Sequence, residues 1–199
     1  NSKVPFILDG DGNVHLYIHQ DAKKEHIIDI VINSKVQRPG VCNALETLLI
    51  NSEIYQDMGS LIIEELLENK VELFVDEKIK EDFPNLNLAN ESHYETEFLD
   101  LKLAVKVVES VDQAIEHIKL YSSGHTEAIL TESKEVADTF SKSIDSSVIF
   151  INSSTRFTDG EMFGFGSEIG ISTQKLHVRG PMGLEALTNE RYVVTGEGT

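Results

Sequence analysis

The chain has 199 residues, 40% of them hydrophobic, and a formal net charge of −17 that gives a pI near 4.7. This apolar share is enough to bury a core, so we expect a globular protein of one large domain or slightly more. So acidic a composition argues against sequence-independent binding to nucleic acid or to an anionic membrane surface, because both depend on clustered Lys and Arg.

Strands and helices are predicted to alternate along the first half of the chain. Residues 5–8 and 13–18 are rich in β-forming side chains, and the turn signal Asp-Gly-Asp-Gly separates them. Residues 22–33 carry apolar side chains at helical spacing, and Asp21 is the expected N-cap of that helix. The pattern then predicts a strand at 46–50, a helix at 53–69, a strand at 71–75 and a loop at 83–90.

The same alternation continues to residue 151. Strands are expected at residues 103–108, 127–130 and 147–151, with helices at 111–121 and 133–143 between them. This order is typical of an α/β domain with a largely parallel sheet flanked by helices. After residue 152 glycines become frequent and long apolar runs are few, so we expect a looped tail with a terminal strand at 191–195.

Cys42, the only cysteine, is the first candidate for chemistry. Pro39 fixes φ and Gly40 permits tight backbone geometry, so a bend is expected to hold the thiol at an exposed apex. A helix beginning at or after Cys42 would favour the thiolate, and we then expect alkylation faster than that of a model thiol at neutral pH. The alternative is a small buried side chain without chemistry, the more common role of a lone cysteine.

Four stretches, in order along the chain, resemble those of one enzyme family. Residues 33–49 contain Gln-Arg-Pro-Gly-Val-Cys and are similar to the active-site segment of the gamma-glutamyl phosphate reductases, a branch of the aldehyde dehydrogenase superfamily. Residues 12–17 resemble a strand of the same family, residues 124–129 its His-Thr-Glu-Ala signature, and residues 152–184 its C-terminal signature. The resemblance covers nearly the whole chain.

The resemblance implies an aldehyde-dehydrogenase-like fold, with a catalytic α/β domain at residues 1–163 and a tail at residues 164–199. This tail would contact a cofactor domain and an oligomer partner. The implied reaction is the NADPH-dependent reduction of L-glutamyl 5-phosphate to L-glutamate 5-semialdehyde, with phosphate release, in proline biosynthesis. NADPH would be bound mainly by an N-terminal domain outside this sequence, because the glycine-rich run at residues 164–170 lacks the spacing of a dinucleotide fingerprint.

We therefore expect a C-terminal piece of a longer enzyme that is a homo-oligomer when complete. The absence of an initiating Met and the early first strand point the same way.

Cys42 would form a thioester in this reaction, and its backbone N–H is the local candidate for binding the oxyanion. The resemblance also implies that Glu161 and Phe163 contact the cofactor, because they match a Glu-x-Phe-Gly element that meets the nicotinamide ribose in the superfamily. The alternative for Glu161 is a solvated loop carboxylate, which is common on so acidic a chain.

Three further residues are candidates for binding the substrate. Arg156 is suited to a bidentate pair with the α-carboxylate, but it could equally tie its loop to a neighbouring acid. Ser172 and Thr173 could donate to the same carboxylate, or they could form an ordinary helix cap.

Metal binding is not expected. The seven histidines lack a paired ligand arrangement, and His125 is expected to make a structural hydrogen bond at the start of a strand. Asp9, Asp11 and Asn13 imitate the beginning of a calcium loop, but later positions lack the glycine and glutamate that such a loop needs.

Two other functions stay open: another aldehyde dehydrogenase, or a non-catalytic oligomerisation or interaction module. We expect a small-molecule substrate rather than nucleic acid, because the chain is strongly acidic. We expect no membrane span, because no apolar run approaches the roughly 20 residues that a span needs. The first residues lack a signal-peptide pattern, and one cysteine cannot form an intrachain disulfide, so a reducing cytoplasm is the expected location.

Overall fold

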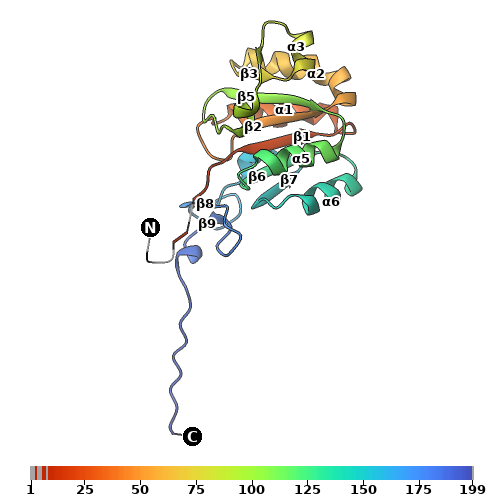
Figure 1. Cartoon of the computed structure of the whole chain (residues 1–199). Coiled ribbons are helices and arrows are strands. Elements are labelled where there is room, and N and C mark those ends of the chain that lie inside the picture. Colours follow the sequence, from red (N-terminus) through yellow and green to blue (C-terminus); the bar gives the residue numbers. More distant parts are fainter. Residues whose placement is uncertain (1–2, 4–5, 8, 199) are drawn as a thin grey trace.

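A computed structural model describes residues 3, 6–7 and 9–198 of the chain. Its centre is a seven-stranded sheet in the order β4-β3-β5-β2-β1-β6-β7, in which every neighbouring pair is parallel (Figure 1). The predicted α/β class with a parallel sheet is therefore confirmed. The strands are β1 (Val14–Ile18), β2 (Leu45–Asn51), β3 (Glu72–Val75), β4 (Asn87–Leu88), β5 (Lys102–Val108), β6 (Thr126–Leu130) and β7 (Val148–Ile151).

Helices cover both faces of this sheet, and successive side chains of β1 enter two different cores. Leu16 and Ile18 belong to a core that also contains side chains of α1 (Lys24–Val36), α2 (Ser52–Glu68) and α3 (Glu77–Asp82). Tyr17 packs on the other face with α5 (Val111–Tyr121) and α6 (Lys134–Ser143). Every residue of β1 and β2 is buried, as expected for parallel strands covered on both faces.

Some boundaries differ from the predicted ones. Asp21 is not the cap of α1, because its carboxylate accepts from Thr131 and pairs with His19, and Lys23 occupies the cap position. The short helices α3 and α4 (Glu91–Glu95) were not predicted, since neither is long enough to show an apolar repeat. Of the strand expected at 5–8, residues 5 and 8 lie outside the described residues, while 6 and 7 are not in a strand.

After β7 the chain forms a small appendage beside the segment that leads into β1 (Figure 1). It contains the 3-10 turn η1 (Thr155–Phe157), the antiparallel pair β8 (Gly170–Ser172) and β9 (Gly180–Met182), and the turn η2 (Glu185–Leu187). An isolated bridge joins Asp9 to Ser172 and so links this appendage to the N-terminal segment.

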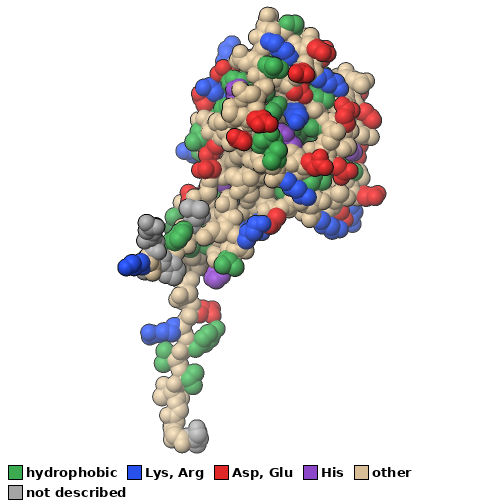
Figure 2. Space-filling model, in the orientation of Figure 1, with side chains coloured by type: hydrophobic (Ala, Val, Ile, Leu, Met, Phe, Trp, Pro, Cys, Tyr) green, Lys and Arg blue, Asp and Glu red, His purple; other side chains and the backbone are tan. Residues whose placement is uncertain are grey.

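Residues 189–198 extend away from the body and form no strand, contrary to the strand expected at 191–195 (Figure 1). An extended segment without a neighbour has no partner for its backbone N–H and C=O groups. Figure 2 shows hydrophobic side chains along this segment, and Tyr192 and Val194 are 84% and 92% exposed.

The segments that lead into β1, β2, β5 and β6 meet at the amino edge of the sheet, because parallel strands begin at the same edge. Open α/β sheets usually bind ligands at the opposite, carboxyl edge. The candidate site described below therefore has an unusual position relative to the strands. Within the described residues, no helix has the length and apolarity needed to cross a membrane.

Candidate active site

Cys42 lies in the connection of residues 37–44, which leads from α1 into β2 at the amino edge of the sheet; we call it the Cys42 loop. Pro39 and Gly40 form a turn just before Cys42, as their backbone preferences predict, and the thiol-bearing residue itself is half-buried in a second turn. No helix begins at or after Cys42, since Leu45 already starts β2. The helix N-terminus that would have favoured the thiolate is therefore not present at this loop.

The surroundings of Cys42 oppose its ionisation. Burial and the carboxylates of Asp9, Glu168 and Glu97 raise the pKa of Cys42 to about 11. The expectation of a thiol activated within this chain is thus also wrong, because the helix dipole is missing and the nearby charges are negative. At neutral pH this thiol holds its proton, and it must transfer that proton before it can act as a nucleophile.

Two of these carboxylates are fixed by backbone N–H groups. Glu97 Oε1 accepts from Gly12 N at 2.8 Å, and Glu168 Oε2 accepts from Gly160 N at 2.8 Å. Burial is the main cause that raises the pKa of both glutamates above the usual range of a carboxyl group. Carboxyl groups with this increased proton affinity are suited to exchange a proton with a neighbouring thiol.

Gly12 approaches the backbone of Cys42 more closely than any side chain would allow. A Cβ placed on Gly12 would lie 1.7 Å from the carbonyl oxygen of Cys42, well inside van der Waals contact. The segment that leads into β1 therefore forms one wall of the Cys42 loop, and only glycine fits at this point of contact.

The residues around η1 form the opposite wall. Asn43, next to the nucleophile candidate, donates from Nδ2 to Thr158 O at 2.7 Å and accepts at its own carbonyl from Thr155 Oγ1 at 2.8 Å. These hydrogen bonds join residues more than a hundred positions apart in the chain. They place the connection after β7 directly against the Cys42 loop.

Arg156, a predicted substrate ligand, is brought to this loop. Its Nε donates to Gln37 Oε1 at 2.8 Å, which orients the guanidinium. Burial and the neighbouring Arg38 lower the pKa of Arg156, while Asp159 and, once ionised, Cys42 act in the opposite direction, so the thiol lies near the guanidinium. Among the described residues, no acceptor is hydrogen-bonded to the terminal nitrogens of Arg156.

Ser172 and Thr173 lie beside the N-terminal segment. Ser172 is fully buried in β8, and its hydroxyl is within hydrogen-bond distance of Gln174, with its Oγ accepting from Gln174 N at 3.3 Å. Its hydroxyl thus makes a local turn contact rather than facing solvent. Thr173 is half-buried, and a side chain on Gly10 would overlap its hydroxyl.

Glu161 and Phe163 lie in an exposed turn. The backbone N–H of Glu161 donates to Asp159 Oδ1 at 2.9 Å, and the ring of Phe163 packs against those of Phe150 and Phe165. Within the described part of the chain, no hydrogen bond or ion pair joins either residue to the Cys42 loop. Their cofactor role stays a prediction.

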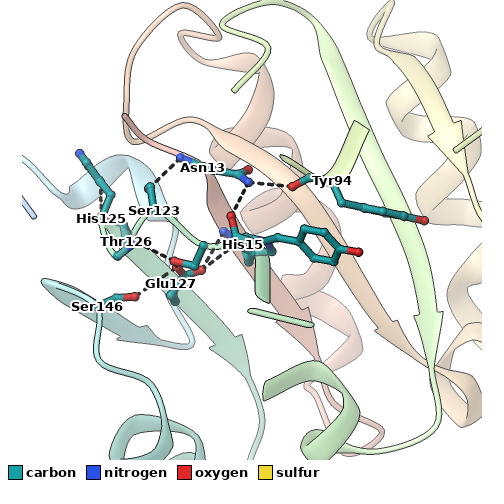
Figure 3. Close-up of polar contacts among 11 residues, drawn as sticks. Asn13, His15, Tyr94, Ser123, His125, Thr126, Glu127 and Ser146 are labelled. Atoms are coloured by element: carbon teal, nitrogen blue, oxygen red, sulfur yellow. Dashed lines mark hydrogen bonds and ion pairs between the residues drawn. The ribbon is translucent and has the colours of Figure 1, made fainter. Parts of the chain in front are cut away.

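A buried polar network joins the amino halves of β1 and β6 next to this site (Figure 3). Glu127 Oε2 accepts from the backbone N–H of His15 at 3.0 Å and lies 3.1 Å from its Nδ1. The other oxygen of Glu127 accepts from Ser122 and Ser146. Both His15 and Glu127 are fully buried, so the network fixes the neighbouring strands β1 and β6 against each other.

A second set of hydrogen bonds surrounds Asn13, the buried residue after Gly12. Asn13 donates from Nδ2 to the carbonyls of Tyr94 and Tyr121 at 2.7 and 2.8 Å, and its backbone N–H donates to Ser123 (Figure 3). His125 has the expected structural contact at the start of β6, with Nδ1 2.8 Å from Thr126 Oγ1.

Sequence reasoning missed Glu97 and Glu168 as neighbours of the thiol, and it placed Gly12 in a turn before a strand without foreseeing its contact with Cys42. Glu168 lies in a glycine-rich run and Glu97 in a polar stretch, so no periodicity or spacing singled them out. In the part of the chain that the structure describes, no group of three or more His, Cys, Asp or Glu side chains is placed to hold a metal ion.

Comparisons with known proteins reveal relatives over the whole chain. The sequence is 52% identical over 198 residues to the gamma-glutamyl phosphate reductase of Thermoanaerobacter pseudethanolicus, a match that covers 100% of this chain and 48% of the relative. It is 48% identical over 197 residues to that of Thermotoga maritima, covering 99% and 48%. The chain thus spans about half the length of the curated relatives it matches. No family model matches the sequence.

Solved structures agree with these relatives. The crystal structure of the gamma-glutamyl phosphate reductase from Thermotoga maritima matches with a TM-score of 0.95 at 48% identity, covering 100% of this chain and 48% of that one. An acetylating aldehyde dehydrogenase from Geobacillus thermoglucosidasius matches with a TM-score of 0.72 at 16% identity, covering 100% and 54%. The second match shows the fold alone, and the aldehyde-dehydrogenase-like fold implied by the resemblance is confirmed.

Proposed function

Because the chain is related along its whole length to the gamma-glutamyl phosphate reductases, we propose that it forms the catalytic portion of such an enzyme. The reaction is the reduction of L-glutamyl 5-phosphate to L-glutamate 5-semialdehyde with release of phosphate, in proline biosynthesis. The observation that carries this proposal is the Cys42 loop, which bears the thiol and, through Gln37, holds the guanidinium of Arg156 at the same edge of the sheet. The complete enzyme would contain a further portion that binds most of the cofactor.

Cys42 is the nucleophile in this scheme. Its sulfur adds to the γ-carbonyl carbon, and the bond from that carbon to the phosphate oxygen then breaks, which gives a thioester and free phosphate. The thiol proton passes to a nearby base, for which Glu97 and Glu168 are the neighbouring carboxylates with increased proton affinity. The backbone N–H of Cys42 is suited to stabilise the oxyanion that develops on the carbonyl oxygen.

NADPH, when bound, supplies the hydride that reduces the thioester to the aldehyde and returns the thiol. The residues of this chain that fit such a cofactor are Glu161, whose carboxylate is exposed on its turn, and the partly exposed ring of Phe163. A carboxylate accepting from ribose hydroxyls and an aromatic ring beside the nicotinamide are chemically sensible partners. Most of the contacts, including those to the phosphates, would come from outside this chain.

Arg156 is suited to hold the α-carboxylate of the substrate. Its Nε donates to Gln37, which fixes the orientation of the guanidinium and leaves the two terminal nitrogens for a ligand. These two nitrogens lie in one plane and can donate two parallel hydrogen bonds to a carboxylate. Thr173 could add a hydroxyl donor. Ser172 is the weaker candidate, because its hydroxyl is buried against Gln174.

We also propose that the complete enzyme is a cytoplasmic homo-oligomer. A catalytic thiol must stay reduced, which suits a reducing compartment. The exposed apolar segment around Tyr192 and Val194 has unpaired backbone groups that would suit pairing with a second copy.

The test is an assay of the complete enzyme with Cys42→Ser and Arg156→Met variants. Cys42→Ser should remove reductase activity while changing the free energy of unfolding by less than about 1 kcal/mol, because it is a near-isosteric change at a half-buried site. Arg156→Met should raise KM for the acyl phosphate by about 10-fold or more, since a charge-assisted bidentate pair is lost. Full activity of Cys42→Ser would overturn the proposal.

A further inference from the structure

A fully buried ion pair joins the helix and the strand that flank the Cys42 loop. Lys35 Nζ lies 2.8 Å from Glu46 Oε2, and both side chains have no exposed surface. Lys35 is in the last turn of α1, where a cation also interacts favourably with the helix dipole, and Glu46 is the second residue of β2. The pair therefore closes the connection that carries Cys42 at the point where it leaves the helix and enters the sheet.

The same carboxylate holds a third segment. Glu46 Oε1 accepts from the backbone N–H of Leu99 at 3.1 Å, and Leu99 has a left-handed backbone with φ of 51°. Two residues earlier, Glu97 accepts from Gly12, whose backbone touches the carbonyl of Cys42. Glu46 is thus shared between the loop that carries the thiol and the segment that places a carboxylate beside it.

A buried ion pair is a costly way to fill this space if stability is its only role. Two charges lose their hydration on burial, and a well-packed apolar pair of similar volume is often equally stable or more so. An apolar contact is non-directional, however, whereas the pair and its hydrogen bond to Leu99 fix three segments at defined distances.

We propose that Lys35 and Glu46 are positioning residues that set the place and the burial of the Cys42 thiol. This rests on the proposed function only in taking that thiol as the reacting group. Neither side chain touches the substrate, and both act through the backbone of the loop.

The decisive variant is the double substitution Lys35→Met/Glu46→Gln, which removes both charges. The amide introduced at position 46 keeps an oxygen that can accept from the N–H of Leu99. The single variants Lys35→Met and Glu46→Gln each leave an unpaired buried group and should lower Tm, and the double variant should recover most of that loss. A matched control is Lys24→Met/Asp57→Asn, which removes an exposed pair, 2.9 Å apart, between α1 and α2.

The first readout is the rate at which iodoacetamide alkylates Cys42 in the chain itself, measured against pH. In the parent the carboxylates of Asp9, Glu97 and Glu168 act on the thiol, and none of the variants changes these three residues. If the pair positions the loop, the double variant hydrates the thiol and reacts about 10-fold faster or more at pH 8, while the control pair reacts like the parent. The second readout is kcat of the complete enzyme, which should fall about 10-fold or more with KM for the acyl phosphate changed by less than about threefold.

A purely structural pair gives a different result. In that case the double variant, once its Tm is recovered, alkylates and turns over like the parent, and the proposal is overturned. If the complete parent enzyme has no reductase activity, the proposed function fails, but the alkylation profile of the chain still decides whether the pair positions the thiol.

Discussion

At the scale of single residues, the thiol of Cys42 is surrounded by groups that favour its protonated form. We expect the alkylation rate of Cys42 in this chain to be about 100-fold below that of a model thiol at pH 7, because a pKa raised by about two units reduces the thiolate by that factor. Below pH 10 the rate should rise about tenfold with each pH unit. A rate that reaches its plateau below pH 9 would show that the carboxylates and burial do not control the thiol.

His117 gives the protein a measurable sensitivity to acid. Burial lowers the pKa of His117 to about 2, so between that value and the ordinary 6.5 the unfolded chain binds a proton that the folded chain does not. Stability contributed by this group is complete above pH 6.5 and is lost as the pH falls. His125 acts in the same direction, with a pKa lowered to about 4, whereas Glu46, with its pKa raised to about 7, acts in the opposite direction.

The contribution of His117 can be isolated by comparing the parent with His117→Phe. Between pH 7 and pH 5 the free energy of unfolding of the parent should fall by about 2 kcal/mol more than that of the variant, because only the parent carries this titrating imidazole. Chemical denaturation at both pH values measures this difference. Parallel pH profiles for the two proteins would mean that the pKa of His117 is the same in the folded and unfolded states.

At the scale of elements, most of the parallel sheet was predictable, because long apolar runs and helical repeats are local signals. The helix at 111–121 was predicted with its observed bounds, and the helix predicted at 133–143 forms as α6, with Ser133 as its cap accepting from Val136 N. The errors come from tertiary contacts. Asp21 was expected to cap α1, but its carboxylate instead binds His19 and Thr131. The strand expected at 191–195 does not form, because no described segment pairs with it.

The backbone of Gly12 lies so close to that of Cys42 that adding one methyl group at position 12 tests the contact. Gly12→Ala places a Cβ onto the carbonyl oxygen of Cys42, so we expect a loss of at least about 2 kcal/mol in the free energy of unfolding. Gly40→Ala is the control, since the nearest atom to its new Cβ is Leu99 O at 3.5 Å, and its change should stay within about 1 kcal/mol. Equal effects of the two substitutions would contradict the close approach.

At the scale of the whole molecule, the site is assembled from segments that sequence reasoning could not place together. Cys42 and Arg156 were both predicted as site residues, but their meeting depends on hydrogen bonds such as that between Asn43 and Thr158, which are 115 positions apart. The carboxylates around the thiol and the buried pair of Lys35 and Glu46 are likewise brought together only by the tertiary fold. Local patterns carry no information about such pairs.

The C-terminal part of the chain divides into two regions of different protection. Residues 170–172 and 180–182 pair with each other and are largely buried, whereas Tyr192 to Val194 are exposed and unpaired. In a monomer of this chain, we expect the amides of residues 192–194 to exchange at nearly their intrinsic rates and those of β8 and β9 to exchange more slowly. Hydrogen exchange followed by mass spectrometry checks this, and slow exchange at 192–194 in a demonstrated monomer would contradict it.

The central claim is that Cys42 carries the acyl group during the reaction. The most direct measurement is the covalent state of Cys42 after the complete enzyme is incubated with glutamate 5-semialdehyde and NADP+ in the absence of phosphate, so that the reverse reaction stops at the thioester. We expect a burst of NADPH stoichiometric with the enzyme, and peptide mass spectrometry should place the acyl group on Cys42. A burst with Cys42 unmodified, or with the acyl group on another residue, would contradict it.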